Sequence, residues 1–262
     1  MGVNAKIEVP VIEFCSSDLE RGTDGWHHLC KRVREACETY GCFEVVYKRV
    51  SKKVREEMFG LVKELVQVPL ERKQKNASPL PYHGWVGPCS QVSLLYEGFG
   101  LGDLLNLCGL MVTHAFGEYE SGLFAHTEKP VSTVICEDQV SGLEIEVKDG
   151  QWIKLSNLSP SSFVFVVGDP LKAWSNGRLK AVNHRVMMSG DKDRYSIATF
   201  AIPGEGTIIK APKELIDEQH PQLYKDFNFM DFFRFAFSDR AKNIESGQQL
   251  HAFASLSPPI SD

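Results

Sequence analysis

Alternating apolar and polar residues, rich in Val and Ile, recur in short stretches from residue 124 to residue 210. Because successive side chains of a strand point to opposite faces, this period of two predicts strands with one face in a core. An Asp-Gly pair at 149–150 predicts a hairpin turn. Many short strands with regular turns predict a β-sandwich or jelly roll. The expected strands are residues 131–136, 143–147, 152–155, 163–167, 181–188, 194–202 and 207–210.

The first part of the chain predicts helices around a short strand. Apolar residues recur at helical spacing over residues 24–40, with Asp24 as the expected N-cap and Gly41 ending the helix. A strand is expected over residues 42–47. Ser51 should then open a second helix that Pro69 stops. Its expected buried face consists of Val54, Met58, Leu61, Val62 and Leu65.

Two further segments give weaker patterns. Residues 76–92 are rich in Pro, Gly and Ser, which predicts an irregular segment whose Tyr82 and Trp85 either line a pocket or cover the core. The apolar stretch 94–116 predicts a short helix over residues 103–114. A helix is also expected over residues 228–246, where a stripe of phenylalanines should pack into the core: Phe229, Phe232, Phe233 and Phe237.

Composition excludes several classes of protein. The chain has 262 residues, 43% of them hydrophobic, and a net charge of −5, so it can bury a core but offers no basic field for nucleic acid. No apolar run approaches the ~18 residues of a spanning helix, and the first residues do not form a signal peptide. Seven cysteines without a Cys-x-x-Cys pair predict reduced thiols and a cytoplasmic protein.

Polar residues with metal-binding potential fall on the predicted strands. His126 and Glu128 are spaced i, i+2, so they point to the same face of a strand, and His184 lies in another strand that a rolled sheet can bring close. Two imidazoles and one carboxylate can hold ferrous iron and leave open positions. Arg194 and Ser196 form a second i, i+2 pair, which suits a carboxylate. From spacing alone, ordinary core or surface roles stay equally open.

Several motifs stand in the order found in one family. Together they resemble the core of plant Fe(II)/2-oxoglutarate-dependent dioxygenases, most of all the AOP-type branch of specialised metabolism. The motifs are His126-Thr127-Glu128-Lys129, Gly142-Leu143-Glu144-Ile145, Val167-Gly168-Asp169, Trp174-Ser175-Asn176-Gly177-Arg178, His184-Arg185-Val186 and Arg194-Tyr195-Ser196.

This resemblance implies a fold and a ligand set. The fold would be mixed α/β, with a double-stranded β-helix (jelly roll) core, an N-terminal helical extension and a C-terminal helix. His126, Glu128 and His184 would occupy the iron-ligand positions, while Arg194 and Ser196 would bind the distal carboxylate of the cosubstrate 2-oxoglutarate. Fe(II) would be the metal, and ascorbate would support turnover.

Two departures from the family pattern qualify this reading. The acid in the iron motif is Glu128 where the family has Asp, and the extra methylene moves the carboxylate by about one C–C bond. Between Leu107 and Phe124 the family has additional helices and a core strand with a tyrosine that helps bind 2-oxoglutarate. Here Tyr119 is the nearby candidate. The expected domains are therefore 1–107, an N-terminal extension, and 108–262, a β-helix domain truncated at its start.

The expected function is oxidative tailoring of a hydrophobic plant metabolite: hydroxylation, desaturation or ring formation. Short members that resemble limonoid furan synthases suggest a triterpenoid substrate. One alternative is a lyase, isomerase or cyclase on the same scaffold without redox turnover. Another is an inactive or binding homologue, or a gene model that lacks an exon. Tyr82, Trp85 and Phe124 are the expected pocket residues, and the protein is expected to be a monomer without nucleic-acid or membrane partners.

Overall fold

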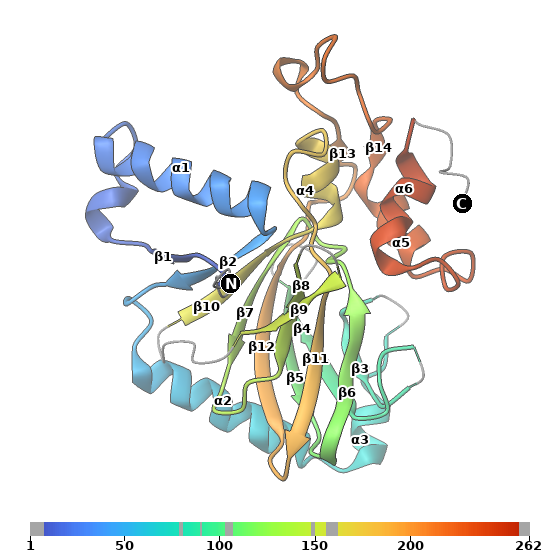
Figure 1. The fold of residues 1–262 in the computed structure, drawn as a ribbon. Helices are drawn as coiled ribbons and strands as arrows, with labels where there is room; N and C mark the ends of the chain where they lie inside the picture. Colours follow the sequence, from blue (N-terminus) through green and yellow to red (C-terminus); the bar gives the residue numbers. More distant parts are fainter. Residues whose placement is uncertain are drawn as a thin grey trace, which may run out of the picture.

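The fold is built on two facing β-sheets surrounded by helices (Figure 1). A computed structural model describes residues 8–78, 81–89, 91–102, 107–147, 150–155 and 162–256. Within these ranges the larger sheet has eight strands, which pair antiparallel except for the parallel pair β1 and β2. In spatial order they are β1 (Val11–Glu13), β2 (Cys42–Val46), β10 (Ser162–Val167), β7 (Ser132–Glu137), β12 (Arg194–Ala201), β5 (Leu107–Thr113), β4 (Tyr96–Leu101) and β3 (Gly84–Val86).

The smaller sheet faces this one and holds both candidate histidines. Among the described residues its order is β6 (Gly117–His126), β11 (His184–Gly190), β8 (Leu143–Glu146) and β9 (Trp152–Lys154). From β6 to β12 the chain passes back and forth between the two sheets. That alternation is the double-stranded β-helix, so the predicted jelly-roll core is confirmed. A separate short pair, β13 (Ile208–Ile209) and β14 (Phe227–Asn228), follows.

The main core fills the space between the sheets. Leu143 and Ile145 of the smaller sheet belong to the same buried cluster as Val164 and Ala198 of the larger one. The cluster extends to the C-terminal helices, whose Phe229, Phe232 and Phe233 are buried in it. This confirms that the phenylalanine stripe is core packing. The exception is Phe237, which is 48% exposed.

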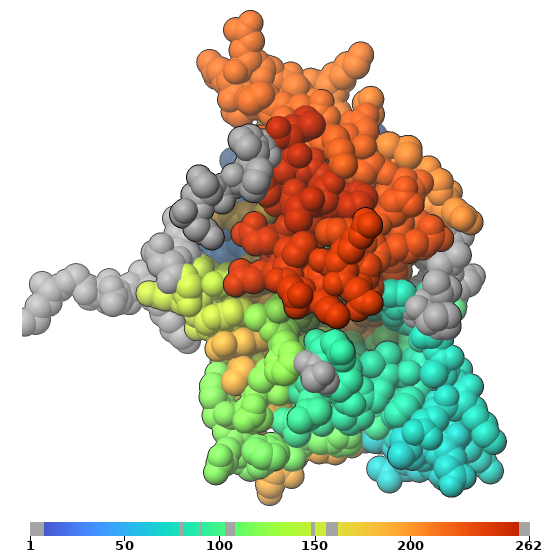
Figure 2. All heavy atoms as spheres, turned by 90° about the vertical axis from the view of Figure 1, so that its right-hand side faces the viewer, coloured from blue at the N-terminus to red at the C-terminus, as the bar shows by residue number. Residues whose placement is uncertain are grey.

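Helices cover the outer face and the ends of the sheets (Figure 1), and the C-terminal part of the chain, red and orange in Figure 2, forms the upper part of the face seen there. Val62 of the second helix packs with Phe99 and Leu110 of the larger sheet, while Leu29 of the first packs with Ile12 and Phe43. The helices are α1 (Asp24–Thr39), α2 (Lys52–Val66), α3 (Leu70–Gln74), α4 (Asp169–Trp174), α5 (Phe229–Ala236) and α6 (Gln249–Ala254), with short 3-10 turns η1 (Ser16–Leu19), η3 (Lys213–Leu215) and η4 (Ser246–Gln248).

The helix predicted over residues 103–114 is wrong. Residues 103–106 lie outside the described ranges, and Leu107–Thr113 is strand β5, in the middle of the larger sheet between β12 and β4. Val112 faces α2, whereas Met111 faces the core between the sheets. A strand buried on both faces has no polar alternation, and its apolar run therefore looks like a helix in the sequence.

Three helix details also differ from the expectation. The N-cap of α1 is Thr23, whose Oγ1 accepts a hydrogen bond from the Trp26 N–H at 3.1 Å, and not Asp24. Ser51 caps α2 as predicted, but the buried residues of α2 are Phe59, Val62 and Val66. Of the expected face, Val54 and Leu61 are 50% and 56% exposed. The third is the phenylalanine-rich helix, which ends at Ala236.

Several other expectations are confirmed or fall outside the described ranges. The strand pair β8 and β9 forms as predicted, although Lys148 and Asp149 of its turn lie outside those ranges. All seven cysteines are free thiols. Of the helices described, none is long and apolar enough to cross a membrane.

Candidate metal centre and cosubstrate site

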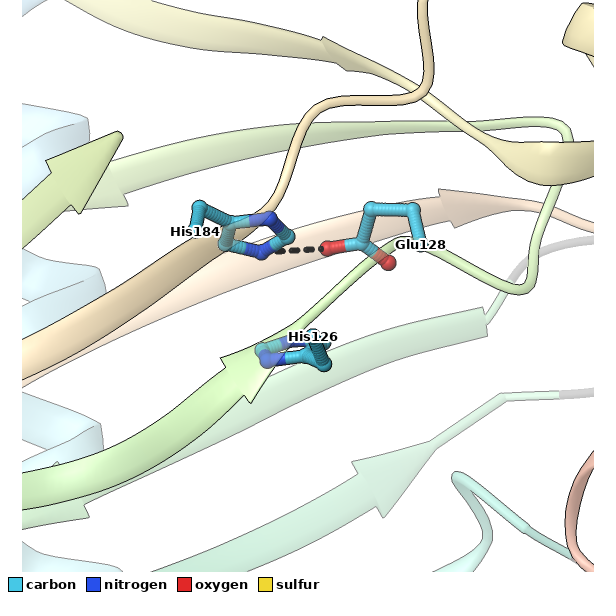
Figure 3. A group of neighbouring side chains, drawn as sticks. All are labelled: His126, Glu128 and His184. Carbon is cyan, nitrogen blue, oxygen red and sulfur yellow. Dashed lines mark ion pairs between the residues drawn. The ribbon is translucent and has the colours of Figure 1, made fainter. Parts of the chain in front are cut away.

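Three side chains converge at one end of the smaller sheet (Figure 3). His126 is the last residue of β6 and pairs in register with His184, the first residue of β11, so the two rings lie 4.2 Å apart between centroids. Glu128 follows β6 and bridges to Gly168 after β10 in the larger sheet. Its Oε1 lies 3.1 Å from His184 Nε2. The three predicted ligands are thus brought together, with their ligand atoms all within 4.8 Å of one another.

Backbone carbonyls orient both rings for metal binding. His126 Nδ1 lies 2.8 Å from the Phe124 carbonyl, and His184 Nδ1 lies 3.4 Å from the Val182 carbonyl. With Nδ1 protonated toward the Phe124 carbonyl, His126 Nε2 keeps the lone pair that a metal requires. Burial, and then the neighbouring His184, lower the pKa of His126 to about 4. His126 is therefore neutral at pH 7, which is its metal-binding form.

Glu128 is buried, at 3% exposure, and its Oε1 faces His184 Nε2. Among the described residues Oε2 has no hydrogen-bond partner. Burial opposes ionisation, but the hydrogen bond and charge of His184 outweigh it, so the pKa of Glu128 lies below its usual value. A buried carboxylate beside two imidazoles is a ligand set that fits a divalent cation. The longer Glu side chain brings a carboxylate oxygen within 4.8 Å of a ring nitrogen of each histidine.

A buried polar network, which the sequence analysis missed, fixes the segment after β6 that carries Glu128. Lys129 Nζ donates to Asp169 Oδ2 at 2.8 Å, to Thr127 Oγ1 at 2.9 Å and to the Ser246 carbonyl at 2.7 Å. Asp169 is fully buried, and its backbone N–H donates to the Glu128 carbonyl. The residues on either side of Glu128, together with residues of α4 and η4, therefore hold its backbone in place.

Arg194 and Ser196 lie on the inner face of the larger sheet, as their spacing predicts. Both are buried, and Arg194 Nη1 donates to Ser196 Oγ at 2.9 Å. A Cβ added to Gly142 of the facing segment would lie 3.0 Å from Arg194 Cδ, so the side chain extends into the space between the sheets. The guanidinium also donates to a third residue, Glu137, through Nε at 2.7 Å and through Nη2. Sequence reasoning did not select Glu137.

The aromatic candidates separate into two groups. Tyr82 packs on Phe200 and Phe233, with ring centroids 4.4 and 5.8 Å apart. Burial, and then the charge of Glu128, raise the pKa of Tyr82, so this ring lies close enough to the metal ligands to sense them. Trp85, in contrast, packs with the cluster between α2 and the outer face of the larger sheet. The structure thus places Trp85 outside the site. Phe124 is 44% exposed, and its pocket role stays a prediction.

Tyr119 points away from the site, while a second tyrosine, missed in the sequence, lies on the inner face of the larger sheet. Tyr119 is 59% exposed and donates to Glu144 at 2.6 Å. Tyr96 of β4 pairs with Thr113 of β5, which pairs with Arg194, so the three share the inner face. Burial raises the pKa of Tyr96, which also responds to the charges of Arg194 and Glu128. Tyr96 was missed because it lies in the apolar stretch 94–116, for which the sequence predicted a short helix and no strands.

This fold and ligand set define a class of non-haem iron enzyme. A model described as the 2OG-Fe(II) oxygenase superfamily matches residues 108–203, and one described as the N-terminal region of non-haem dioxygenase in morphine synthesis matches residues 9–103. The "Probable 2-oxoglutarate-dependent dioxygenase AOP1" of Arabidopsis thaliana is 30% identical, covering 97% of this chain and 98% of that protein. The chain belongs to the 2OG-Fe(II) oxygenase superfamily and is an AOP-like 2-oxoglutarate/Fe(II) dioxygenase.

Other relatives and solved structures agree. The 2-oxoglutarate-dependent dioxygenase AOP3 of Arabidopsis thaliana is 41% identical over 139 residues, which cover 53% of this chain and 33% of that protein. The rice dioxygenase for auxin oxidation has a TM-score of 0.79 at 27% identity, covering 95% of this chain and all of that chain. The AOP1 alignment spans 322 positions, 60 more than the 262 residues of this chain, so this chain is gapped relative to AOP1.

Proposed function

We propose that this protein oxidises a hydrophobic plant metabolite with Fe(II) and 2-oxoglutarate, and that His126, Glu128 and His184 hold the iron. The observation that supports this is the convergence of two imidazoles and one buried carboxylate, whose ligand atoms all lie within 4.8 Å of one another. When bound, the iron and 2-oxoglutarate would supply the oxidising chemistry that removes a substrate hydrogen.

The residues of the chain would position and shield that chemistry. Arg194 and Ser196 would bind the distal carboxylate of 2-oxoglutarate through charged and hydroxyl donors. Tyr96 shares that inner face and would contact the same molecule. The network around Lys129 and Asp169 would keep Glu128 in place, because a metal site tolerates only about 0.2 Å of error in ligand distance.

Aromatic side chains near the ligands support a hydrophobic substrate. Tyr82, whose pKa responds to the charge of Glu128, packs against Phe200, Phe233 and Phe237. Apolar surroundings of this kind suit an apolar molecule better than a phosphate or a sugar. We propose a triterpenoid-like metabolite as the first class to test, with hydroxylation, desaturation or ring formation as the outcome.

Incubation of the purified protein with candidate metabolites tests this proposal. Product detected by mass spectrometry should require Fe(II) and 2-oxoglutarate, and should be accompanied by succinate. Ascorbate is expected to prolong turnover. The variants His184→Ala and Arg194→Ala should each lose activity. Product that forms equally with a chelator and without oxygen would contradict the oxidative proposal.

That last outcome would favour the second candidate, a lyase, isomerase or cyclase on the same scaffold. The observation that favours it is that Arg194 is already paired with a carboxylate of the chain, so the cosubstrate position is contested. A non-redox enzyme should tolerate Arg194→Ala. An oxidative enzyme should not.

A further inference from the structure

Glu137, the last residue of β7, is the carboxylate that is paired with Arg194. It pairs in register with Ser196 of β12, and both side chains are almost fully buried. Arg194 Nε and Nη2 donate to the same oxygen, Glu137 Oε1, while Nη1 donates to Ser196 Oγ. The fork that would hold the distal carboxylate of 2-oxoglutarate is therefore already engaged along one edge by a carboxylate of the chain.

The charges of Arg194 and Glu137 affect which ligand can bind beside them. The guanidinium carries one positive charge, which Glu137 neutralises within the space between the sheets. A second carboxylate brought there would share one cation with the first, and like charges in a buried site repel each other strongly. Arg55 of α2 is the other described cation that contacts Glu137, but it donates to the main-chain carbonyl and not to the carboxylate.

We propose that Glu137 is a specificity-determining residue that competes with the distal carboxylate of 2-oxoglutarate for Arg194. A neutral residue of the same shape at this position would leave the positive charge of the guanidinium available to the distal carboxylate of the cosubstrate. The Arg194–Glu137 pair lowers the affinity of the protein for 2-oxo acids with a charged tail. It does not lower the affinity for a 2-oxo acid with an apolar tail. This inference rests on the proposed role of Arg194 and Ser196.

The test is an equilibrium titration that does not depend on turnover. The Mn(II)-loaded protein is titrated anaerobically by calorimetry with 2-oxoglutarate and with 2-oxopentanoate, in which a methyl group replaces the distal carboxylate. In the unmodified protein the two Kd values should lie within about threefold of each other. Glu137→Gln should bind 2-oxoglutarate about tenfold or more tightly than the unmodified protein, since one charge-assisted hydrogen bond contributes affinity of that order. Its Kd for 2-oxopentanoate should not change.

A matched control separates this effect from general loss of a buried carboxylate. Glu97 is also buried in an ion pair, with Lys73, and that pair is on the outer face of the same sheet. Glu97→Gln should leave both Kd values unchanged.

Two results would overturn the inference, and they are distinguishable. If the unmodified protein prefers 2-oxoglutarate by tenfold or more and Glu137→Gln does not bind it more tightly, Glu137 does not compete, while the proposed cosubstrate site stands. If neither protein binds either oxo acid in the presence of the metal, the proposed cosubstrate site fails as well. The preference of the unmodified protein is informative even if the variant does not fold.

Discussion

At the scale of a single residue, the metal site depends most on Glu128. Its carboxylate reaches His184 across 3.1 Å, so the extra methylene is accommodated by the surrounding backbone. Glu128→Gln keeps the shape and removes the charge, and it should lower Mn(II) affinity by about a hundredfold or more, because even changes around metal ligands cost 10- to 100-fold. Calorimetric titration with Mn(II) measures this. Glu128→Asp should retain part of the affinity, and a variant that bound more tightly than the unmodified protein would show that the site is not built for Glu.

Thiol reactivity is a second property of single residues. Burial raises the pKa of Cys37 and Cys136 to about 11 and that of Cys42 to about 12, whereas Cys15 is exposed. The thiolate is the reactive form, so these three should stay unmodified by iodoacetamide at pH 8, while Cys15 is alkylated. Labelling should begin only as the pH approaches the raised values or the protein unfolds. Peptide mass spectrometry over time checks this, and labelling of Cys42 as fast as Cys15 would contradict the burial.

At the scale of the element, the buried face of α2 gives a direct stability test. Val62 is fully buried against Phe99 and Leu110, while Leu61 is 56% exposed. Val62→Ala should lower the free energy of unfolding by about 2 kcal/mol, since it removes two methyl groups and leaves a cavity. Leu61→Ala should change it by less than about 0.5 kcal/mol. Urea unfolding measures both changes. Equal losses would mean that Leu61 is buried, as the sequence predicted.

The same element shows what sequence patterns can and cannot predict. Ser51 and Pro69 located the ends of α2, because capping and the missing proline N–H are local effects. Its apolar residues extend around more than one face, so periodicity alone could not select the buried one. The helix predicted over residues 103–114, where β5 lies, was wrong for a related reason, since both faces of β5 are covered. The strands from β7 to β12 were predicted well, because each has turn residues at its ends.

The site was predicted from local spacing only in part. Arg194 and Ser196 lie on one strand, as their i, i+2 spacing predicted. His126 and Glu128 do not share a strand as expected, because β6 ends at His126 and Glu128 bridges to Gly168 of the other sheet. Glu137 and Tyr96 became visible only through pairing between strands: Glu137 lies 57 residues before Arg194 in the sequence and is joined to it by strand order. The pairing register between strands that are far apart in the sequence cannot be predicted from any single segment of the chain.

For the whole molecule, the metal centre links the two sheets. His126 and His184 belong to the smaller sheet, while Glu128 bridges to Gly168 at the end of β10 in the larger one. A cation bound by all three ligands would therefore oppose separation of the sheets. Mn(II) at about 100 times its Kd should add about 2.7 kcal/mol to the free energy of unfolding, which raises the Tm by roughly 5–10 °C for a chain of this size. Differential scanning calorimetry measures the shift.

His184→Ala is the matched variant for this measurement, because it removes one ligand from the smaller sheet and leaves the Lys129–Asp169 pair intact. Its Tm should not respond to Mn(II), and a chelator should lower the Tm of the loaded unmodified protein to that of the metal-free protein. A shift of equal size in both proteins would mean that the cation binds elsewhere. No shift in either would mean that the three ligands do not hold it, whatever fold surrounds them. Since stabilisation by binding depends only on preference for the folded state, this result is independent of substrate and of turnover.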